Sequence, residues 1–503
     1  EKMILEEEVH KAPAPRSWSR PRVLQIFLFP ALGGLLFGYD IGATSYVIGQ
    51  LRDEDASGTQ WHGLVEGSAL LQGCITSSGV GGALLGSVLV FRVTKLLGTR
   101  GEMRVAALLF VLGAGVEFLA GAPLLNRPNT GNPGGQAGGQ AGTLGLVVLL
   151  AGRWTYGLAC GFAMHGAPSY IGELAPPGVR GALVSLKEGM IVMGMLLGYL
   201  VGWALEHVRG GWRFTFGLSA LPALAMLFGV GRLLPASPRW LCERGEFLEA
   251  KRALGFVYTD PAAADGVMSE VLASIDESKS MAAEAQGRGE RGGLWAPKNR
   301  RGLIVGLGVV TLQQVTGQPS ILYYAAGIFK DAGLASYAAV LTGAFKLLMT
   351  CASVLLVDRL GRRGLLMAGI GCMALALTVM AGAFYGYQPK EDPEDSDDGK
   401  GGGLTRRTGT IIAGMFLYIG GYQVSFGPIA WLLISEVFAL DVRDTAIALA
   451  VQCNFAWNLA VSFAYPSLVG GLGALLGSRS KAMRRGVQTK GAGGALTVPP
   501  GHF

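Results

Sequence analysis

Apolar stretches of about 20 residues recur along most of this chain, and they restrict its fold more than any other feature. A helix needs about 20 apolar residues to cross about 30 Å of hydrocarbon. Only 15% of the 503 residues are charged, whereas a soluble domain carries about 25%. The chain therefore lacks the charge to cover a water-facing surface. The sequence predicts an all-α, multi-pass integral membrane protein.

Eleven apolar spans are predicted. Their bounds are roughly 23–49, 67–91, 103–125, 144–171, 181–206, 212–235, 303–326, 338–357, 364–386, 409–435 and 445–477. Residues 1–22 form a cytoplasmic N-terminal segment, because its basic residues follow the bias of Lys and Arg towards the cytoplasm. The polar tail 478–503 contains nothing apolar enough to span. We therefore expect the last helix to be missing or truncated in this sequence.

A polar insert divides the spans into two halves. Residues 236–302 separate an N-terminal six-helix half, 23–235, from a C-terminal helical half, 303–477. The many Lys and Arg of the insert place it in the cytoplasm, where we expect short helices joined by flexible chain. Loop residues repeat between the halves at a constant offset of 263 residues: Gly98 and Gly361, Arg100 and Arg363, Glu173 and Glu436, Arg180 and Arg443. Two parallel six-helix repeats that rock around a central site account for this repeat.

Seven separated motifs carry a resemblance to a known family. They are GGLLFGYDIG (Gly33–Gly42), AGRWTYGLACG (Ala151–Gly161), YIGELAPPGVRGALVSLKE (Tyr170–Glu188), PASPRWL (Pro235–Leu241), QQVTGQPSILYY (Gln313–Tyr324), VDRLGRRG (Val357–Gly364) and GPIAWLLISEVF (Gly427–Phe438). Together they resemble the sugar-porter branch of the major facilitator superfamily. The wording is most similar to plant and algal vacuolar or plastidic glucose transporters and D-xylose-proton symporter-like proteins. The resemblance implies the major facilitator fold and transport of a hexose or pentose by alternating access.

Asp40 lies within the first span, where a carboxylate costs roughly 2.5–3.5 kcal/mol and must be paired, protonated or hydrated. Arg153, early in the fourth span, is the next deep charge. In the porters that this chain resembles, the matching acid couples to protons and the matching arginine is its partner. Burial raises the pKa of an acid and a nearby arginine lowers it, so rearranging such a pair loads and releases a proton. The alternative is a structural ion pair that fixes helix register.

A sugar site needs hydrogen-bonding groups on a dry wall and an aromatic face for the ring. Gln313 and Gln314 are adjacent amides early in the seventh span, and each can donate and accept. The resemblance assigns both to sugar hydroxyls. It adds four residues to the same site: Phe37, Tyr324, Trp431 and Asn454. Glu188 stands where the family has a sugar-binding glutamine, so specificity does not transfer from the relatives. The alternative for the amides is hydrogen bonding between helices.

Charged residues at the cytoplasmic helix ends form a third group. They are Glu173, Arg180, Asp358, Arg359, Arg362, Arg363, Glu436 and Arg443. In relatives, the matching residues connect the two halves while the transporter is open outward, so we interpret the group as a cytoplasmic gate. The alternative is solvated loop charge that follows the positive-inside bias. Lys95 and Thr99 depart from the family pattern in the first repeat.

These features predict secondary active transport of a monosaccharide across a lipid bilayer, as sugar–proton symport, by a protein that functions as a monomer. The proton is the coupling ion, and we expect no cofactor, metal or nucleic-acid partner. Two alternatives stay open: facilitated diffusion, in which Asp40 is only structural, and a non-transporting sugar sensor. An enzyme is not expected, because the sequence lacks a nucleophile–base set, a phosphate loop and a metal cluster. The sugar, the membrane (vacuolar, plastid envelope or plasma membrane) and the direction of flux are left open.

Overall fold

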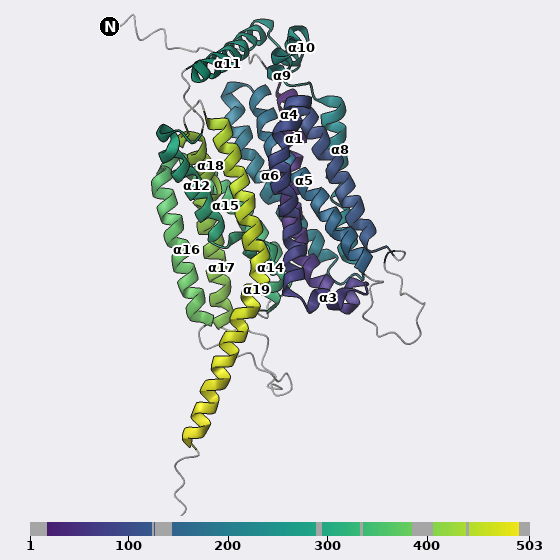
Figure 1. Cartoon of the computed structure of the whole chain (residues 1–503), viewed down its shortest axis with the longest axis vertical. Coiled ribbons are helices and arrows are strands. Elements are labelled where there is room, and N and C mark those ends of the chain that lie inside the picture. The colour runs from purple at the N-terminus through teal and green to yellow at the C-terminus, as the bar shows by residue number, and fades with distance from the viewer. Residues whose placement is uncertain are drawn as a thin grey trace, which may run out of the picture.

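Two bundles of helices stand side by side, one from each half of the chain (Figure 1). The computed structural model describes residues 18–122, 125, 143–287, 294–331, 335–384, 406–438 and 442–491, and for parts of these helices the backbone alone. Within these ranges, strand-type pairing is limited to one isolated bridge between Trp18 and Tyr258. The prediction of an all-α protein is therefore confirmed.

The N-terminal bundle contains the helices of the first six predicted spans. They are α1 (Arg20–Arg52), α2 (Glu54–Ser57), α3 (His62–Glu66), α4 (Ala69–Ala120), α5 (Thr143–Leu174), α6 (Pro177–Ala204), α7 (Gly211–Gly217), α8 (Ala220–Phe228) and the π-helical turn η1 (Gly229–Leu233). Helix α4 covers two predicted spans, and the chain reverses at Gly98, where φ is 69° and ψ is 172°. Glycine adopts such a backbone without the clash that a Cβ would cause.

Helices α4 and α5 pack closely because glycines face each other where they cross. A Cβ on Gly157 of α5 would lie 1.9 Å from the carbonyl oxygen of Gly79 on α4. A Cβ on Gly79 would lie 3.0 Å from Nη2 of Arg153. Small residues let membrane helices approach in this way. This contact brings the Arg153 guanidinium against α4 and towards α1.

The polar segment after the sixth span folds into helices that lie across one end of the bundles (Figure 1), and one of them, with 27 residues, is longer than the short helices expected. They are α9 (Pro238–Glu243), α10 (Phe247–Val257), α11 (Pro261–Gly287) and the 3-10 turn η2 (Pro297–Asn299). Arg22, at the start of α1, donates a 2.9 Å hydrogen bond to the carbonyl oxygen of Phe256. The start of α1 therefore lies at the same end as this basic segment, which the positive-inside bias makes the cytoplasmic end.

The C-terminal bundle contains the remaining helices. They are α12 (Arg300–Val315), α13 (Gln318–Tyr323), α14 (Ala325–Asp331), α15 (Ala338–Leu360), α16 (Arg362–Phe384), α17 (Arg406–Val424), α18 (Phe426–Val437) and α19 (Arg443–Gly491). The seventh predicted span is broken into α12, α13 and α14, and Gly317, with φ of 86°, separates the first two. Helix α19 runs through the bundle and extends beyond it at the end opposite α9 to α11 (Figure 1).

Within the described ranges, eight helices are long and apolar enough to cross a membrane, compared with eleven predicted spans. The difference has three causes. The two predicted spans within α4 are counted once although a non-helical turn at Gly98 separates them, and the seventh span is divided into three short helices. The eighth predicted span lies in α15, which is 23 residues long, but only its part Ala338–Ser353 is considered for this count. Each of the eleven predicted spans nevertheless overlaps helical chain, and the one structural difference behind the lower count among the described residues is the division of the seventh span.

Polar contacts between the two halves gather at the end opposite the cytoplasmic helices, which we call the outer end. The contacts there are Tyr199 Oη to Leu322 O (2.8 Å), Ala326 N to Ser45 Oγ (2.9 Å), Ser336 Oγ to Glu206 Oε1 (3.0 Å) and Tyr46 Oη to Ser336 O. A weaker contact, Gln452 Nε2 to Ser87 O at 3.4 Å, lies nearer the middle of the bundle. Among the described residues, the halves are therefore hydrogen-bonded mainly at the outer end.

Candidate functional site

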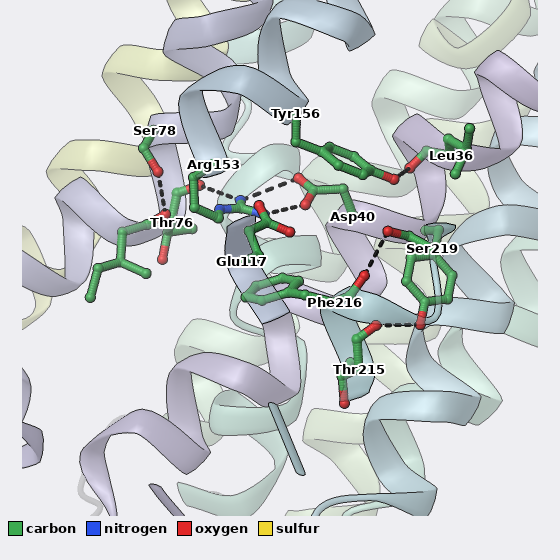
Figure 2. A network of polar contacts seen from close by, with 12 residues as sticks. Leu36, Asp40, Thr76, Ser78, Glu117, Arg153, Tyr156, Thr215, Phe216 and Ser219 are labelled. Carbon is green, nitrogen blue, oxygen red and sulfur yellow. Dashed lines mark hydrogen bonds and ion pairs between the residues drawn. The ribbon is translucent and has the colours of Figure 1, made fainter. Parts of the chain in front are cut away.

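Asp40 and Arg153 form a buried ion pair between two helices of the N-terminal bundle. Helix α1 carries Asp40, which is 5% exposed, and α5 carries Arg153, which is fully buried. Nη1 of Arg153 donates to Oδ1 of Asp40, and Nη2 donates to Oδ2 at 3.2 Å (Figure 2). A bidentate pair of this kind is stronger and more directional than a single charged hydrogen bond. The structure therefore places the two predicted proton-coupling residues in direct contact, while their proton role stays a prediction.

The surroundings of this pair are dry and aromatic. Cζ of Arg153 lies 5.0 Å from the centroid of the Phe216 ring, in the geometry of a cation–π contact. Nη2 of the same guanidinium is 3.5 Å from the carbonyl oxygen of Thr76. Tyr156, one turn along α5, donates to the carbonyl oxygen of Leu36 at 3.1 Å (Figure 2). Charges act strongly on each other in such a water-poor environment.

A second carboxylate, which the sequence analysis missed, lies beside the pair. Glu117 of α4 is 1% exposed, and its Oε1 is 3.8 Å from Nη1 of Arg153. Figure 2 shows it next to the guanidinium that binds Asp40. The signal that singled out Asp40, a carboxylate inside an apolar span, is equally present at Glu117 in the span 103–125. The site therefore contains two acids and one arginine.

Gln313, Gln314 and Asn454 form a polar wall in the C-terminal bundle. Gln313 on α12 is 4% exposed and donates from Nε2 to the carbonyl oxygen of Phe426 at 3.0 Å. Asn454 on α19 donates to Oε1 of Gln313 at 3.2 Å. Gln314 is 5% exposed, and its Oε1 has no hydrogen-bond partner among the described residues. The wall therefore offers at least one buried acceptor for a ligand hydroxyl.

The aromatic residues predicted for the sugar site fall in three different surroundings. The Phe37 ring on α1 meets the Phe455 ring on α19 edge to face, with centroids 6.0 Å apart. The Tyr324 ring stacks on Tyr465 at 4.7 Å. Trp431 is half-buried and packs on the apolar cluster between α12, α18 and α19. Phe37 therefore contacts the residue next to Asn454 of the wall. In the part of the chain that the structure describes, no hydrogen bond joins Tyr324 or Trp431 to the amides of the wall.

Glu188 on α6 is only partly buried, and its Oε1 lies 3.4 Å from Nζ of Lys187. A second cation, Lys346 of α15, is 7% exposed and interacts electrostatically with Glu188 from the other half of the chain. The sequence analysis missed Lys346, although a lysine inside the predicted span 338–357 carries the same signal as Asp40. Glu188 therefore has neutralising partners, which answers the charge problem that an acid in place of glutamine creates.

The predicted cytoplasmic gate is only partly described. Glu173 accepts a 2.9 Å hydrogen bond from Oγ1 of Thr99. Arg180 is exposed and donates from Nε to the carbonyl oxygen of Ala175 at 3.2 Å, and Arg362 and Arg363 are also exposed. The side chains of the other four gate residues lie outside the described part of the chain: Asp358, Arg359, Glu436 and Arg443. The gate therefore stays a prediction.

An acid–histidine pair in the N-terminal bundle joins a partly exposed histidine to a buried acid that the sequence analysis missed. Glu102 is fully buried, and its Oε1 lies 2.9 Å from Nδ1 of His165. Oγ1 of Thr94 donates to the other carboxylate oxygen at 2.5 Å. Glu102 stands at the edge of a predicted span, just before residue 103, where a charge is usually solvated and carries little signal.

Residues 26–483 match the family model described as "Sugar (and other) transporter". The chain belongs to this family. One relative, the D-xylose-proton symporter-like 3, chloroplastic, of Arabidopsis thaliana, is 40% identical over 479 residues, which cover 92% of this chain and 77% of that protein. Its family makes the chain a membrane transporter rather than an enzyme, as predicted.

Solved structures of the same type share the fold. The xylose transporter XylE from E. coli, in a partially occluded inward open conformation, aligns with a TM-score of 0.67 and 25% identity, over 89% of this chain and 92% of that chain. The proton:xylose symporter XylE bound to 6-bromo-6-deoxy-D-glucose aligns with a TM-score of 0.67 and 26% identity, over 89% of each chain. The prediction of the major facilitator fold for this transporter is therefore confirmed.

Proposed function

We propose that this transporter carries a monosaccharide together with a proton by alternating access. The observation that carries the proposal is the bidentate Asp40–Arg153 pair, buried inside the N-terminal bundle. An acid held in this way, deep in a span, is a place where a proton is bound and released. The relative from Arabidopsis and XylE are named as D-xylose-proton or proton:xylose symporters, which supports the same assignment here.

The substrate is a hexose or pentose bound between the two bundles. The polar wall of Gln313, Gln314 and Asn454 supplies donors and acceptors for sugar hydroxyls, and Phe37 supplies an aromatic ring from the opposite bundle. Glu188 adds a strong acceptor at the position of the family's glutamine. A binding site of this kind combines apolar walls with a few well-placed polar groups.

Helix α1 connects proton binding to the sugar site. Phe37, three residues before Asp40, touches Phe455 of the C-terminal bundle. Ser45, five residues after Asp40, accepts the hydrogen bond from Ala326 that helps to close the outer end. When Asp40 accepts a proton it loses its charge, so its attraction to Arg153 weakens. We expect α1 to shift when this attraction weakens. The shift would move both the Phe37–Phe455 contact and the hydrogen bond between Ser45 and Ala326.

The arrangement in this structure corresponds to the inward-facing stage of that cycle. The inter-half hydrogen bonds at the outer end exclude solvent from that side, since Tyr199 is fully buried and Ser45 is 1% exposed. In an alternating-access cycle, closure of the outer end accompanies release of sugar and proton to the cytoplasm.

Facilitated diffusion is the second candidate, and one observation favours it. The Asp40–Arg153 pair also joins α1 to α5 beside the close contact of α4 with α5, so it has a structural use without any proton. The two candidates differ in whether a proton gradient drives sugar against its own gradient.

Uptake into liposomes that contain only this transporter separates the candidates. Labelled D-xylose and D-glucose are supplied at equal concentration inside and outside, with the inside alkaline. Symport predicts sugar accumulation that a protonophore abolishes. Facilitated diffusion predicts exchange of label with no accumulation at any pH gradient, and that result would remove proton coupling from the proposal.

A further inference from the structure

Lys346 carries an ammonium group inside the C-terminal bundle and has a carboxylate only at longer range. The residue lies near the middle of α15 and is 7% exposed. Among the described side chains, Glu188 is the acid that acts on it electrostatically, but the close ion pair of Glu188, at 3.4 Å, is made with Lys187. Charged side chains inside a membrane are costly, and they usually mark a substrate or ion path. The position of Lys346 therefore indicates a function in transport.

The three charged groups between α6 and α15 do not neutralise one another. Lys187 and Lys346 are each 7% exposed, and both act on the single carboxylate of Glu188. With all three groups ionised, the set has one positive charge in excess. A buried charge without a counter-charge is unfavourable. One monovalent anion placed near Lys346 would make the set neutral.

This set of charges faces the polar wall of the proposed sugar site. Tyr422 of α17 is 5% exposed. Its hydroxyl lies within hydrogen-bonding reach of the Gln313 side chain and interacts electrostatically with Glu188. Glu188 belongs to the N-terminal half and Tyr422 to the C-terminal half, so the carboxylate faces the wall from the opposite bundle. Lys346, which acts on the same carboxylate, therefore lies next to the sugar site.

The packing of α15 places Lys346 on this side. Gly343, one turn before Lys346, lies against α6, because a Cβ there would be 2.9 Å from Cδ2 of Tyr199. Residues three apart share one face of a helix, so Lys346 lies on the α6 face of α15. Thr350, one turn further along, is also buried, and its hydroxyl donates to the Lys346 carbonyl oxygen at 2.8 Å. Among the residues described, the ammonium group therefore remains open to a ligand.

We propose that Lys346 binds the carboxylate of a sugar acid, and that this transporter prefers a hexuronate to the neutral hexose with the same ring. The polar wall and Phe37 bind the ring, whose hydroxyls the two sugars share. Lys346 provides the charge for the carboxylate that a hexuronate carries at C6. Lys187 stays paired with Glu188, which reduces the repulsion between that acid and the incoming anion. This inference rests on the proposed function and adds the chemical class of its substrate.

A neutral hexose satisfies this site less well. Its hydroxyls accept a hydrogen bond from the ammonium group, but they leave the positive charge uncompensated. A hydrogen bond between an ammonium group and a carboxylate is roughly twice as strong as one between neutral groups. The difference should therefore appear as a substrate preference that depends on the charge at position 346.

Competition against the uptake of labelled D-glucose into liposomes tests this proposal. The competitors are D-glucuronate and unlabelled D-glucose, which differ only at C6. In the wild type, D-glucuronate should halve the uptake at a lower concentration than D-glucose does. In Lys346→Gln, the ratio of these two concentrations should shift about tenfold to a hundredfold against D-glucuronate, the usual effect of losing a charged hydrogen bond.

Two further variants serve as controls for the competition experiment. Lys346→Arg keeps the charge and should keep the preference for D-glucuronate. Lys330→Gln removes an exposed lysine of α14 and should leave the ratio at its wild-type value. D-glucuronate that competes no better than D-glucose in the wild type, or an unchanged ratio in Lys346→Gln, would overturn the proposal.

A second measurement uses the wild-type protein alone. A proton that moves with a neutral hexose carries one positive charge, whereas a proton that moves with a hexuronate anion carries none. At equal pH on both sides, an inside-negative potential of about 100 mV should raise the steady-state accumulation of D-glucose by up to about fiftyfold. The same potential should leave D-glucuronate at equal concentrations inside and outside. Failure of labelled D-glucuronate to enter, or its accumulation in response to the potential, overturns the proposal.

The two proposals fail in different ways. If a proton gradient does not drive accumulation of D-glucose by the wild type, the proposed symport fails. If D-glucose accumulates with protons while D-glucuronate neither competes nor enters, the symport stands and only the inference about Lys346 fails.

Discussion

Asn454 donates a 3.2 Å hydrogen bond to Oε1 of Gln313, and Nε2 of Gln313 in turn donates to the carbonyl oxygen of Phe426. The Gln313 amide is therefore engaged on both sides and joins α12, α18 and α19. The neighbouring Gln314 differs, because its buried Oε1 has no partner within the described ranges. Gln313 organises the polar wall, and we expect the unpaired acceptor of Gln314 to bind the sugar.

Gln314→Ala should weaken sugar binding by about 1–3 kcal/mol, the usual effect of losing a buried hydrogen-bonding group, while the protein still folds. Equilibrium binding of labelled sugar to purified protein measures it. Gln72→Ala is the matched control, since the Gln72 amide donates to Val65 O at the outer end, away from the wall. Equal affinity in Gln314→Ala and wild type would remove Gln314 from the site.

Tyr199→Phe should increase the fraction of molecules in which the outer end is open. The Tyr199 hydroxyl donates to the Leu322 carbonyl oxygen across the two halves at 2.8 Å. Losing one such bond costs about 1 kcal/mol, which changes the ratio of closed to open molecules about fivefold. Spin labels at Gly49 and Lys330, in protein without its native cysteines, report the distance between the halves.

The control for that experiment is Tyr418→Phe. Tyr418 is also fully buried and donates to the Thr316 carbonyl oxygen at 2.9 Å, but both residues belong to the C-terminal half. The distribution of spin-label distances in Tyr418→Phe should match that of the spin-labelled protein without this substitution. A Tyr199→Phe distribution with no added long-distance population would show that this bond does not hold the outer end closed.

Gly157→Ala should disrupt the site by loosening the packing of α4 against α5. Its Cβ would lie 1.9 Å from the Gly79 carbonyl oxygen, so α4 and α5 must move apart. Overpacking of this kind costs about 1–3 kcal/mol or more, and the melting temperature in detergent should fall. Gly115→Ala on α4 meets no atom within 4 Å and should be neutral or stabilising by about 0.5–1 kcal/mol. Equal melting temperatures of the two variants would contradict the packing account.

Hydrophobic spacing and motif wording predicted the all-α fold, the two halves and the family. The pattern predicted the two spans of α4, which a non-helical turn at Gly98 separates, but it could not predict the division of the seventh span. That division follows from the local backbone at Gly317, whose positive φ value a hydropathy pattern does not report.

The candidate site was predicted in part. Asp40 and Arg153, 113 residues apart in sequence, lie in contact, and Gln313 lies against Asn454. Glu117 was missed although it obeys the same rule as Asp40. Which of several buried charges share one partner depends on how α1, α4 and α5 cross, and that is set by close contacts between glycines rather than by the spacing of charges along the chain.

Proton movement during sugar entry tests the central claim most directly. Liposomes that contain the protein and a trapped pH-sensitive dye receive sugar outside, with equal pH on both sides. The account predicts acidification of the interior by the wild type and none by Asp40→Asn, which should still exchange labelled for unlabelled sugar. Glu188→Gln is measured alongside, because Glu188 is the other acid at the sugar site, and it should still acidify. Acidification by Asp40→Asn but not by Glu188→Gln would show that the wrong carboxylate has been named, and sugar entry into wild-type liposomes with no change in pH would contradict symport itself.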